Sequence, residues 1–435
     1  MTLAQVSLWG RTIGAVSWDA ERQVANFEYD AAFAGSGIEV APLTMPTKAD
    51  KKSRRIYSFP GLSRATFRGL PGLLADSLPD DFGNALINNW LARQGRAPDS
   101  FNPVERLCYT GSRGMGALEY APLLGPAEEP AAQLDLDALT ALAADILRSR
   151  DHLQGSFAAA HENTLTDILR VGTSAGGARA KAVIAWNPVT QEVRSGQVKA
   201  GQGFSYWLLK FDGVSGNRDK ELDDPEGYGL IEYGYYLMAR AAGITMAESR
   251  LLCENGRNHF MTKRFDRLDG GGKVHMQTLC AIAHFDFRQP GAYSYEQALQ
   301  VIRRLGLPMA SIEEMFRRMV FNILARNQDD HVKNTAFLMQ PSGSWSLAPA
   351  YDMTYSYNPA GAWTGTHQMS LNGKRDNFEF DDLEACAASC SMKKGRAAAI
   401  LREVAAAVDR WPAFAAEAGV PVSVAQRIQA AYRKL

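Results

Sequence analysis

The chain has 435 residues, of which 46% are hydrophobic and 22% charged, and its 47 basic residues balance 47 acidic ones. This composition is typical of an ordinary globular protein and excludes a disordered chain, while the zero net charge gives no sign of a nucleic-acid or membrane-surface binder. No apolar run reaches the ~20 residues that a membrane-spanning helix needs. The first residues also lack the apolar core of a signal peptide, so we expect a cytoplasmic protein with no membrane partner.

The first part of the chain predicts a small α+β domain over residues 1–125. Residues 4–10 and 13–18 have the alternation of two strands joined by a turn at Gly10–Arg11. A helical pattern follows Asp80 and Asp81, and Gly95 is its expected stop. A stretch rich in Pro, Ala and Glu then marks the end of this domain.

A β-rich part is expected next, over residues 126–265. Residues 178–189 and 205–213 are strand-like, and two more strands are expected on either side of a turn at Asn255–Gly256. One helix, closed by Gly243, interrupts these strands. From residue 266 to 435 the pattern is mainly helical, which predicts two lobes, and a cleft between lobes is a common ligand site.

Polar groups concentrate in the sequence NILARNQDDHVKNTAFL at residues 322–338, after a long helix that we expect to be capped by Ser311. A protein-kinase catalytic loop has an aspartate that accepts the hydroxyl proton and, five residues later, an asparagine that binds Mg²⁺. Asp329 and Asn334 have this spacing, and Asp352 follows as a second metal aspartate. Oxygen ligands suit a hard cation such as Mg²⁺.

The upstream residues offer the other parts of a kinase in the expected order. Residues 171–181 form a Gly-rich turn whose small residues would let backbone N–H groups approach phosphates. Lys210 lies on a strand, Glu232 on the next helix could pair with it, and Lys263 to Phe265 could line an adenine pocket.

Each of these residues also has a plainer interpretation that the sequence leaves open. Asp329 and Asp330 could be a solvated helix end, and Asp352 a turn residue. Lys210 could be a snorkelling lysine on an edge strand, and Glu232 a helix-surface glutamate.

With these motifs in place, the chain resembles the HipA family, which comprises bacterial serine/threonine kinase toxins of toxin–antitoxin modules. The resemblance extends over nearly the whole length. It rests on GLLADSLPDDFG and GSRGMGALEYAP in the first part, and on GTSAGGARAK, LLKF, MTKRFDR, QDDHVKN and LAPAYDM further on. It implies a two-lobed, protein-kinase-like α+β fold, with a β-rich N-lobe and a helical C-lobe, preceded by a small α+β domain.

The resemblance also implies a role for each matching residue. Asp329 and Lys333 would be catalytic, and Asn334 and Asp352 would bind Mg²⁺. The ATP-binding residues would be Ser174, Ala175, Gly176, Gly177, Ala178, Arg179, Lys181, Lys210, Glu232, Lys263, Arg264, Phe265 and His331.

In this family the Gly-rich loop carries a serine whose autophosphorylation silences the kinase, and Ser174 matches that position, with Thr173 adjacent. A phosphate there would place negative charge where ATP phosphates should lie. The chain departs from the family at Arg179, where a glutamine is common, and at Asp330, where a small residue is common. The plain account of Asp330 is a solvated or arginine-paired carboxylate.

The resemblance implies a helix-turn-helix, HipB-like antitoxin as partner, with DNA reached only indirectly through it. A protein substrate such as an aminoacyl-tRNA synthetase is implied as well. The leading hypothesis is therefore an ATP- and Mg²⁺-dependent Ser/Thr protein kinase toxin. The alternatives are a small-molecule kinase, and a catalytically silent kinase-fold corepressor bound to an antitoxin. The intact set of Lys210, Asp329, Asn334 and Asp352 argues against the silent form.

Overall fold

The computed structural model describes residues 2–47, 55–125, 133–148, 180–214 and 227–435. The chain divides into two compact units. The first comprises Met1–Glu226, Leu252–Gln277 and Met339–Ser344, and the second comprises Gly227–Leu251, Thr278–Leu338 and Trp345–Leu435.

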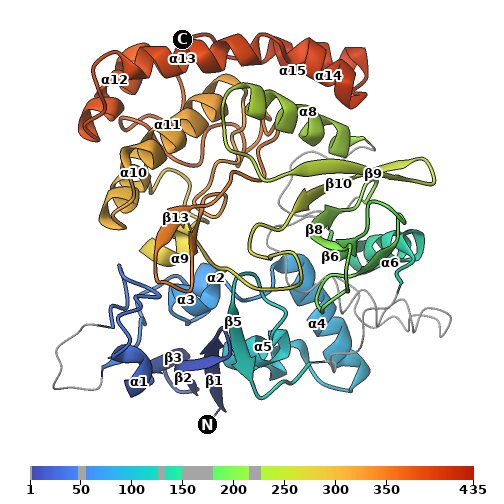
Figure 1. The fold of residues 1–435 in the computed structure, drawn as a ribbon, viewed down its shortest axis with the longest axis vertical. Helices are drawn as coiled ribbons and strands as arrows, with labels where there is room; N and C mark the ends of the chain where they lie inside the picture. The colour runs from blue at the N-terminus through green and yellow to red at the C-terminus, as the bar shows by residue number, and fades with distance from the viewer. Residues whose placement is uncertain (1, 48–54, 126–132, 149–179, 215–226) are drawn as a thin grey trace. The chain divides into compact units, whose positions relative to one another are not determined.

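Two five-stranded antiparallel sheets form the framework of the first unit, in the orders β4-β3-β2-β1-β5 and β7-β6-β8-β10-β9 (Figure 1). The strands of this part are β1 (Thr2–Leu8), β2 (Arg11–Asp19), β3 (Val24–Tyr29), β4 (Ile56–Tyr57), β5 (Leu118–Ala121), β6 (Lys181–Trp186), β7 (Val193–Ser195), β8 (Ser205–Lys210), β9 (Ser249–Glu254), β10 (Arg257–Lys263) and β11 (His275–Thr278). The helices are α1 (Ala31–Ala34), α2 (Arg64–Phe67), α3 (Gly72–Ala75), α4 (Asp81–Arg93), the 3-10 turn η1 (Pro98–Ser100), α5 (Pro103–Thr110) and α6 (Leu136–Arg148).

Local sequence signals explain several of these elements. The two predicted strands are present, but the turn between β1 and β2 lies one residue earlier than expected, at Trp9 and Gly10, which have left-handed backbone with φ of 51° and 76°, and Arg11 already belongs to β2. Helix α4 starts where the Asp80 carboxylate accepts the Gly83 N–H at 2.6 Å, and it ends just before Gly95, whose φ is 69°. The β9–β10 hairpin turns at Asn255 and Gly256, which both have positive φ, as a tight two-residue hairpin turn requires.

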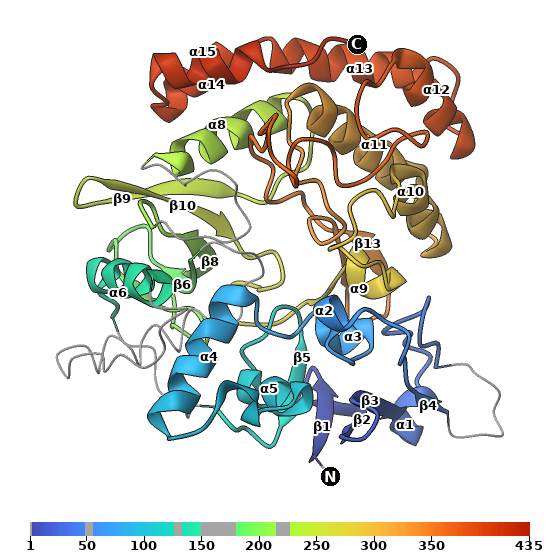
Figure 2. The ribbon, with the colours of Figure 1, turned by 180° about the vertical axis from the view of Figure 1, so that it is seen from behind.

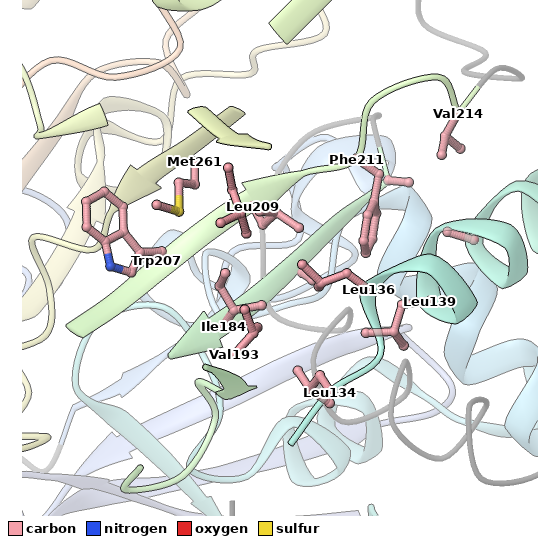
Figure 3. Packing of buried hydrophobic residues seen from close by; sticks show 14 of the residues in the cluster. Leu134, Leu136, Leu139, Ile184, Val193, Trp207, Leu209, Phe211, Val214 and Met261 are labelled. Carbon is pink, nitrogen blue, oxygen red and sulfur yellow. The ribbon is translucent and has the colours of Figure 1, made fainter. Parts of the chain in front are cut away.

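The main core of the first unit lies between one face of the second sheet and helix α6, with α4 packed on α6 (Figure 3). The buried residues of this core come from the sheet, from α6 and from α4. They include Ile184, Val193, Trp207, Leu209 and Met261 of the sheet, Leu136 and Leu139 of α6, Phe82 and Leu86 of α4, and Leu134 just before α6. Burial of each large apolar side chain contributes about 1.5–3 kcal/mol, so this face of the sheet is fully used for stability. Any ligand of the sheet has to use its other face.

The second unit is mainly helical. Its elements are α8 (Tyr228–Ala241), α9 (Leu279–Ala283), α10 (Tyr295–Arg304), α11 (Met309–Leu324), β12 (Ala336–Met339), β13 (Trp345–Leu347), α12 (Phe380–Ser389), α13 (Arg396–Val408), α14 (Trp411–Ala418) and α15 (Val422–Ala430). Helix α8 packs against α13 and α14, and α11 packs against α10 and α13 (Figure 2). The loop that follows α11 therefore starts from a helix held on two sides.

One predicted cap is wrong. Helix α11 starts at Met309, with Pro308 as its N-cap, so Ser311 lies inside the first turn. The Ser311 N–H donates to the Pro308 carbonyl at 2.9 Å. Because proline has a fixed φ and lacks an N–H, it favours a helix start three residues earlier than the serine suggested.

None of the described helices is long and apolar enough to cross a bilayer. The boundaries of the three predicted domains, at 1–125, 126–265 and 266–435, stay a prediction.

Candidate functional site

Two lysines share the face of the second sheet that points away from the main core. Lys181 of β6 and Lys210 of β8 lie directly opposite each other in the antiparallel register, so their side chains leave the sheet on the same side. Ala182 and Leu209, the next pair, are in the main core and so belong to the opposite face. Strand β8 is the middle strand of the five, so the interpretation of Lys210 as an edge lysine is wrong.

Both lysines are buried, with 4% of Lys181 and 7% of Lys210 exposed. The Lys210 Nζ lies 5.7 Å from the centre of the Phe260 ring on β10, whose backbone is paired with Lys210. Two ammonium groups on the same face concentrate positive charge at this part of the sheet. The arrangement suits a polyanionic ligand such as a nucleotide phosphate chain.

The predicted adenine-pocket residues follow β10 directly. The Arg264 N–H donates to the Tyr206 carbonyl at 2.8 Å, so the backbone is still hydrogen-bonded to β8 one residue beyond the end of β10. The Arg264 side chain is only 4% exposed and donates to both oxygens of Asp266, at 2.9 and 2.7 Å. Only the backbone of Arg264 is therefore suited to contact an adenine, because its side chain is committed to Asp266.

Asp266 is the centre of a buried ion cluster with Arg264 and Arg267. Its carboxylate also accepts the Gly116 N–H at 2.7 Å, and Arg267 donates to the carbonyls of Gly114 and Gly116. Burial raises the pKa of Asp266, but the two guanidinium groups and these hydrogen bonds lower it well below its ordinary value. The cluster connects the Gly-rich turn before β5 to the segment after β10.

In the second unit, residues 329–334 form a compact turn beyond α11. The Asn334 N–H donates to the His331 carbonyl at 2.9 Å, and its side-chain amide donates to the Asp329 carbonyl at 2.8 Å. The five-residue spacing of Asp329 and Asn334 thus closes a hydrogen-bonded turn. Helix α11 ends at Leu324 and Asp329 lies five residues beyond it, so the interpretation of Asp329 as part of a helix end is wrong.

The Asp329 side chain is one-third exposed. Its Oδ1 accepts the indole N–H of Trp363 at 2.7 Å, and the His331 Nε2 lies 3.7 Å from the same oxygen. A partly exposed carboxylate that is oriented by a donor suits the role of a general base.

Lys333 and His331 both lie against the ring of Phe287. The Lys333 Nζ is 4.5 Å from the ring centre, and the His331 ring is 5.5 Å from it. The Tyr351 hydroxyl donates to the Lys333 carbonyl at 2.6 Å. This bond links Lys333, the residue before Asn334, to Tyr351, the residue before Asp352.

Asp352 has a left-handed backbone with φ of 55°, which is uncommon for a residue other than glycine. Strained backbone of this kind clusters at functional sites.

The Asp330 side chain lies in a different environment from the one expected. It is 3% exposed, and it accepts hydrogen bonds from the Tyr295 hydroxyl, from the His367 Nδ1 at 2.8 Å and from the Gln368 N–H at 2.7 Å. Burial raises the pKa of Asp330, but His367 and these donors outweigh burial and lower it. The expectation of a solvated or arginine-paired carboxylate is wrong, because the chain folds Asp330 inward while Asp329 points outward.

The donor atoms of the second unit fit Mg²⁺ bound with a nucleotide. With the Asn334 amide group donating to the loop, its oxygen is left as a ligand atom, and Asp352 supplies a carboxylate. In the part of the chain that the structure describes, no group of three or more His, Cys, Asp or Glu side chains could hold a metal. In kinases one Asn and one Asp suffice, because the phosphates supply further ligands. The His331 Nδ1 is buried without a hydrogen-bond partner among the described residues.

The structure brings together Asp329, His331, Lys333 and Asn334 in the second unit, and Lys181 with Lys210 in the first. Glu232 lies on α8 and is 1% exposed, so it is no helix-surface residue. The loop residues Thr173 to Arg179 lie outside the described residues. Sequence reasoning missed Trp363, Tyr295, His367 and Gln368, and only Trp363, a lone tryptophan in a Gly-rich loop, carried any local signal.

Family models match most of the chain. The model of the HipA N-terminal domain matches residues 4–121, and that of the HipA-like C-terminal domain matches residues 173–411. A protein of Sinorhizobium fredii named "Putative kinase Y4mE" is 25% identical over 199 residues, which are 44% of this chain and 41% of that protein. The chain thus matches about two fifths of the length of this curated relative.

HipA of Shewanella oneidensis MR-1, solved with HipB and operator DNA, superposes with a TM-score of 0.67 at 17% identity. The superposition covers 99% of this chain and 95% of that one. This likeness confirms the predicted α+β, two-lobed kinase-like fold. Together with the matches of both family models, it shows that the chain belongs to the HipA family.

Proposed function

We propose that this chain is an ATP- and Mg²⁺-dependent serine/threonine protein kinase that acts in the cytoplasm as the toxin of a toxin–antitoxin module. The observation that carries the proposal is the turn in which Asn334 hydrogen-bonds the backbone of Asp329, since this turn holds a candidate base and a candidate metal ligand in one rigid element. Membership of the HipA family supports it.

Each side chain has a distinct task in this proposal. Asp329 accepts the proton of the attacking serine hydroxyl, and Lys333 offsets the charge that develops on the transferring phosphoryl group. Lys210 and Lys181 hold the phosphates, with Glu232 as the partner of Lys210.

Asn334 and Asp352 would hold the metal, which when bound draws charge from the β- and γ-phosphates. His331 would contact the nucleotide or the γ-phosphate, and its buried Nδ1 supports this role. The backbone from Lys263 to Phe265 would line the adenine.

The Gly-rich loop completes the ATP site through Ser174, Ala175, Gly176, Gly177, Ala178 and Arg179. Autophosphorylation at Ser174, or at Thr173, would silence the enzyme, because a phosphate there competes with ATP for the same positive charge. In this proposal the Gly-rich loop belongs to a β-rich domain over residues 126–265. This domain follows an N-terminal domain over residues 1–125 and precedes a helical lobe over residues 266–435.

The proposed partner is a HipB-like helix-turn-helix antitoxin, through which DNA is contacted indirectly. The solved assembly of the Shewanella protein with HipB and operator DNA supports this partner. The proposed substrate is a protein of the translation apparatus, such as an aminoacyl-tRNA synthetase, which is implied by the family alone.

The test is phosphate transfer by phosphatase-treated protein. Wild type, Asp329→Asn and the control Asp409→Asn are incubated with Mg-ATP and analysed by intact mass and phosphopeptide mapping. Asp409 is exposed at the end of α13, so this control makes the same chemical change away from the loop. We expect phosphate on Ser174 or Thr173 in wild type and the control, and a loss of at least about a hundredfold in Asp329→Asn.

The other outcomes separate the alternatives. Mg-ATP binding without self-phosphorylation would favour a small-molecule kinase. An absence of Mg-ATP binding in unphosphorylated wild type would refute the kinase and leave the silent corepressor.

A further inference from the structure

The segment that follows Asp352 is tied to the catalytic turn by hydrogen bonds from two glutamines. The Gln328 side chain donates to the Thr364 carbonyl at 3.2 Å. The Gln368 side chain donates to the carbonyls of Gln328, Trp363 and Thr366. These bonds hold the backbone on both sides of Trp363 against the loop that carries Asp329.

A tight turn fixes the same segment from within. The Gly365 N–H donates to the Gly361 carbonyl at 3.1 Å, and a Cβ at Gly365 would lie only 2.4 Å from that oxygen. Glycine is therefore required at 365, and the direction of the Trp363 backbone is set by the turn.

Trp363 uses this fixed position to reach the candidate base. Its indole N–H donates to the Asp329 Oδ1 at 2.7 Å, and its ring lies 6.4 Å from the His331 ring. With one oxygen of the carboxylate engaged by the indole, the other oxygen is the one for an incoming hydroxyl. Because the two oxygens belong to one carboxylate, a hydroxyl that binds the second oxygen lies close to the indole ring.

We propose that Trp363 is the acceptor-site residue of this kinase, whose indole N–H orients the Asp329 carboxylate and whose ring forms the wall against which the hydroxyl-bearing residue of a protein substrate fits. This inference rests on the proposed function and assigns it a specificity-determining residue. A purely structural tryptophan would stabilise the fold in the same way but would not affect the choice of acceptor.

Two substitutions separate the parts of this role. Trp363→Phe keeps a ring and removes the N–H, and Trp363→Ala removes the wall as well. Trp411→Phe is the matched control, because it too removes an indole N–H bond in the second unit, here to the Ala425 carbonyl at 3.0 Å, among the C-terminal helices.

The probes are Mg-ATP alone and a degenerate library of serine peptides. We expect Trp363→Phe to lower kcat/KM for the peptides about tenfold or more, as loss of a hydrogen bond to a charged group implies, with the KM for ATP changed less than about twofold. We expect Trp363→Ala to change which residues are preferred beside the serine. Trp411→Phe should leave peptide turnover and preference as in wild type.

Three results would overturn the inference. If the Trp363 variants have the same peptide turnover and the same peptide preference as Trp411→Phe, then Trp363 has only a structural role. Higher peptide turnover in Trp363→Ala would mean that the indole blocks the base. A failure of wild type to bind Mg-ATP would refute the proposed function, and this inference with it. This outcome can be distinguished from the other two because the measurement of nucleotide binding needs no peptide.

Discussion

Replacing Asp330 with asparagine keeps the size of a buried side chain but removes its charge and one acceptor oxygen. The native carboxylate accepts from Tyr295, His367 and Gln368. In the variant, the amide oxygen can replace only one of the two carboxylate oxygens, while the new NH₂ group faces the donor or donors of the other. A hydrogen bond to a charged group contributes about 1.5–3 kcal/mol, and a buried donor left unsatisfied costs about 1–3 kcal/mol. We expect Asp330→Asn to lower the local stability of the loop by about 2–4 kcal/mol.

Hydrogen–deuterium exchange of the amides of residues 326–338 measures this change, because it reports local opening in a chain too large for two-state unfolding. At 1.36 kcal/mol per tenfold, exchange should become about thirty- to nine-hundredfold faster. Asp409→Asn should leave it unchanged. An increase of less than about threefold would refute the account of Asp330 as the anchor of the loop.

The same variant predicts a pH dependence. The folded-state pKa of Asp330 is lowered, so its contribution is complete above its unfolded pKa of about 3.9 and is lost as pH falls toward the folded value. The difference in local stability between wild type and Asp330→Asn should be largest above about pH 4 and shrink below it, as measured by hydrogen–deuterium exchange of residues 326–338 across that range. A difference that grows on acidification would contradict the sign.

Two further predictions concern the first unit. Asp266→Asn leaves two buried arginine partners without their carboxylate. It should lower the local stability around the cluster by about 3–5 kcal/mol, as measured by hydrogen–deuterium exchange of residues 114–120 and 264–267. A change below about 1 kcal/mol would contradict the ion-cluster account. Lys210→Met should weaken ATP binding at least about tenfold in calorimetry, because it removes the ammonium group that would contact a phosphate. The melting temperature should stay within a few degrees, because methionine keeps most of the volume of this buried side chain. Unchanged ATP affinity would place the phosphates elsewhere.

Local signals were enough to predict much of the fold. The β9–β10 hairpin follows from Asn255 and Gly256, and α4 follows from the acidic pair at its start and Gly95 after its end, because caps and turns depend on neighbours in sequence. The predicted N-cap at Ser311 is wrong because a proline and a serine three residues apart both favour a helix start, and the helix begins after the proline.

The environment of the candidate site could not be predicted in this way. Asp329 and Asn334 were found from their spacing, since the turn that joins them is local. Asp330 was misjudged because its partners Tyr295 and His367 lie 35 and 37 residues away, and nothing in the adjacent sequence distinguishes a buried carboxylate from a solvated one.

The ion cluster at Asp266 has a consequence for how the protein can be divided. Arg267 and Asp266 make three hydrogen bonds with the backbone of Gly114 and Gly116. A fragment that begins after the N-terminal domain would keep these charged side chains and lose the peptide groups that satisfy them. The N-terminal domain is therefore an integral part of the lobe that follows it, and deletion or domain-exchange experiments should retain the turn at 114–116 or replace the cluster along with it.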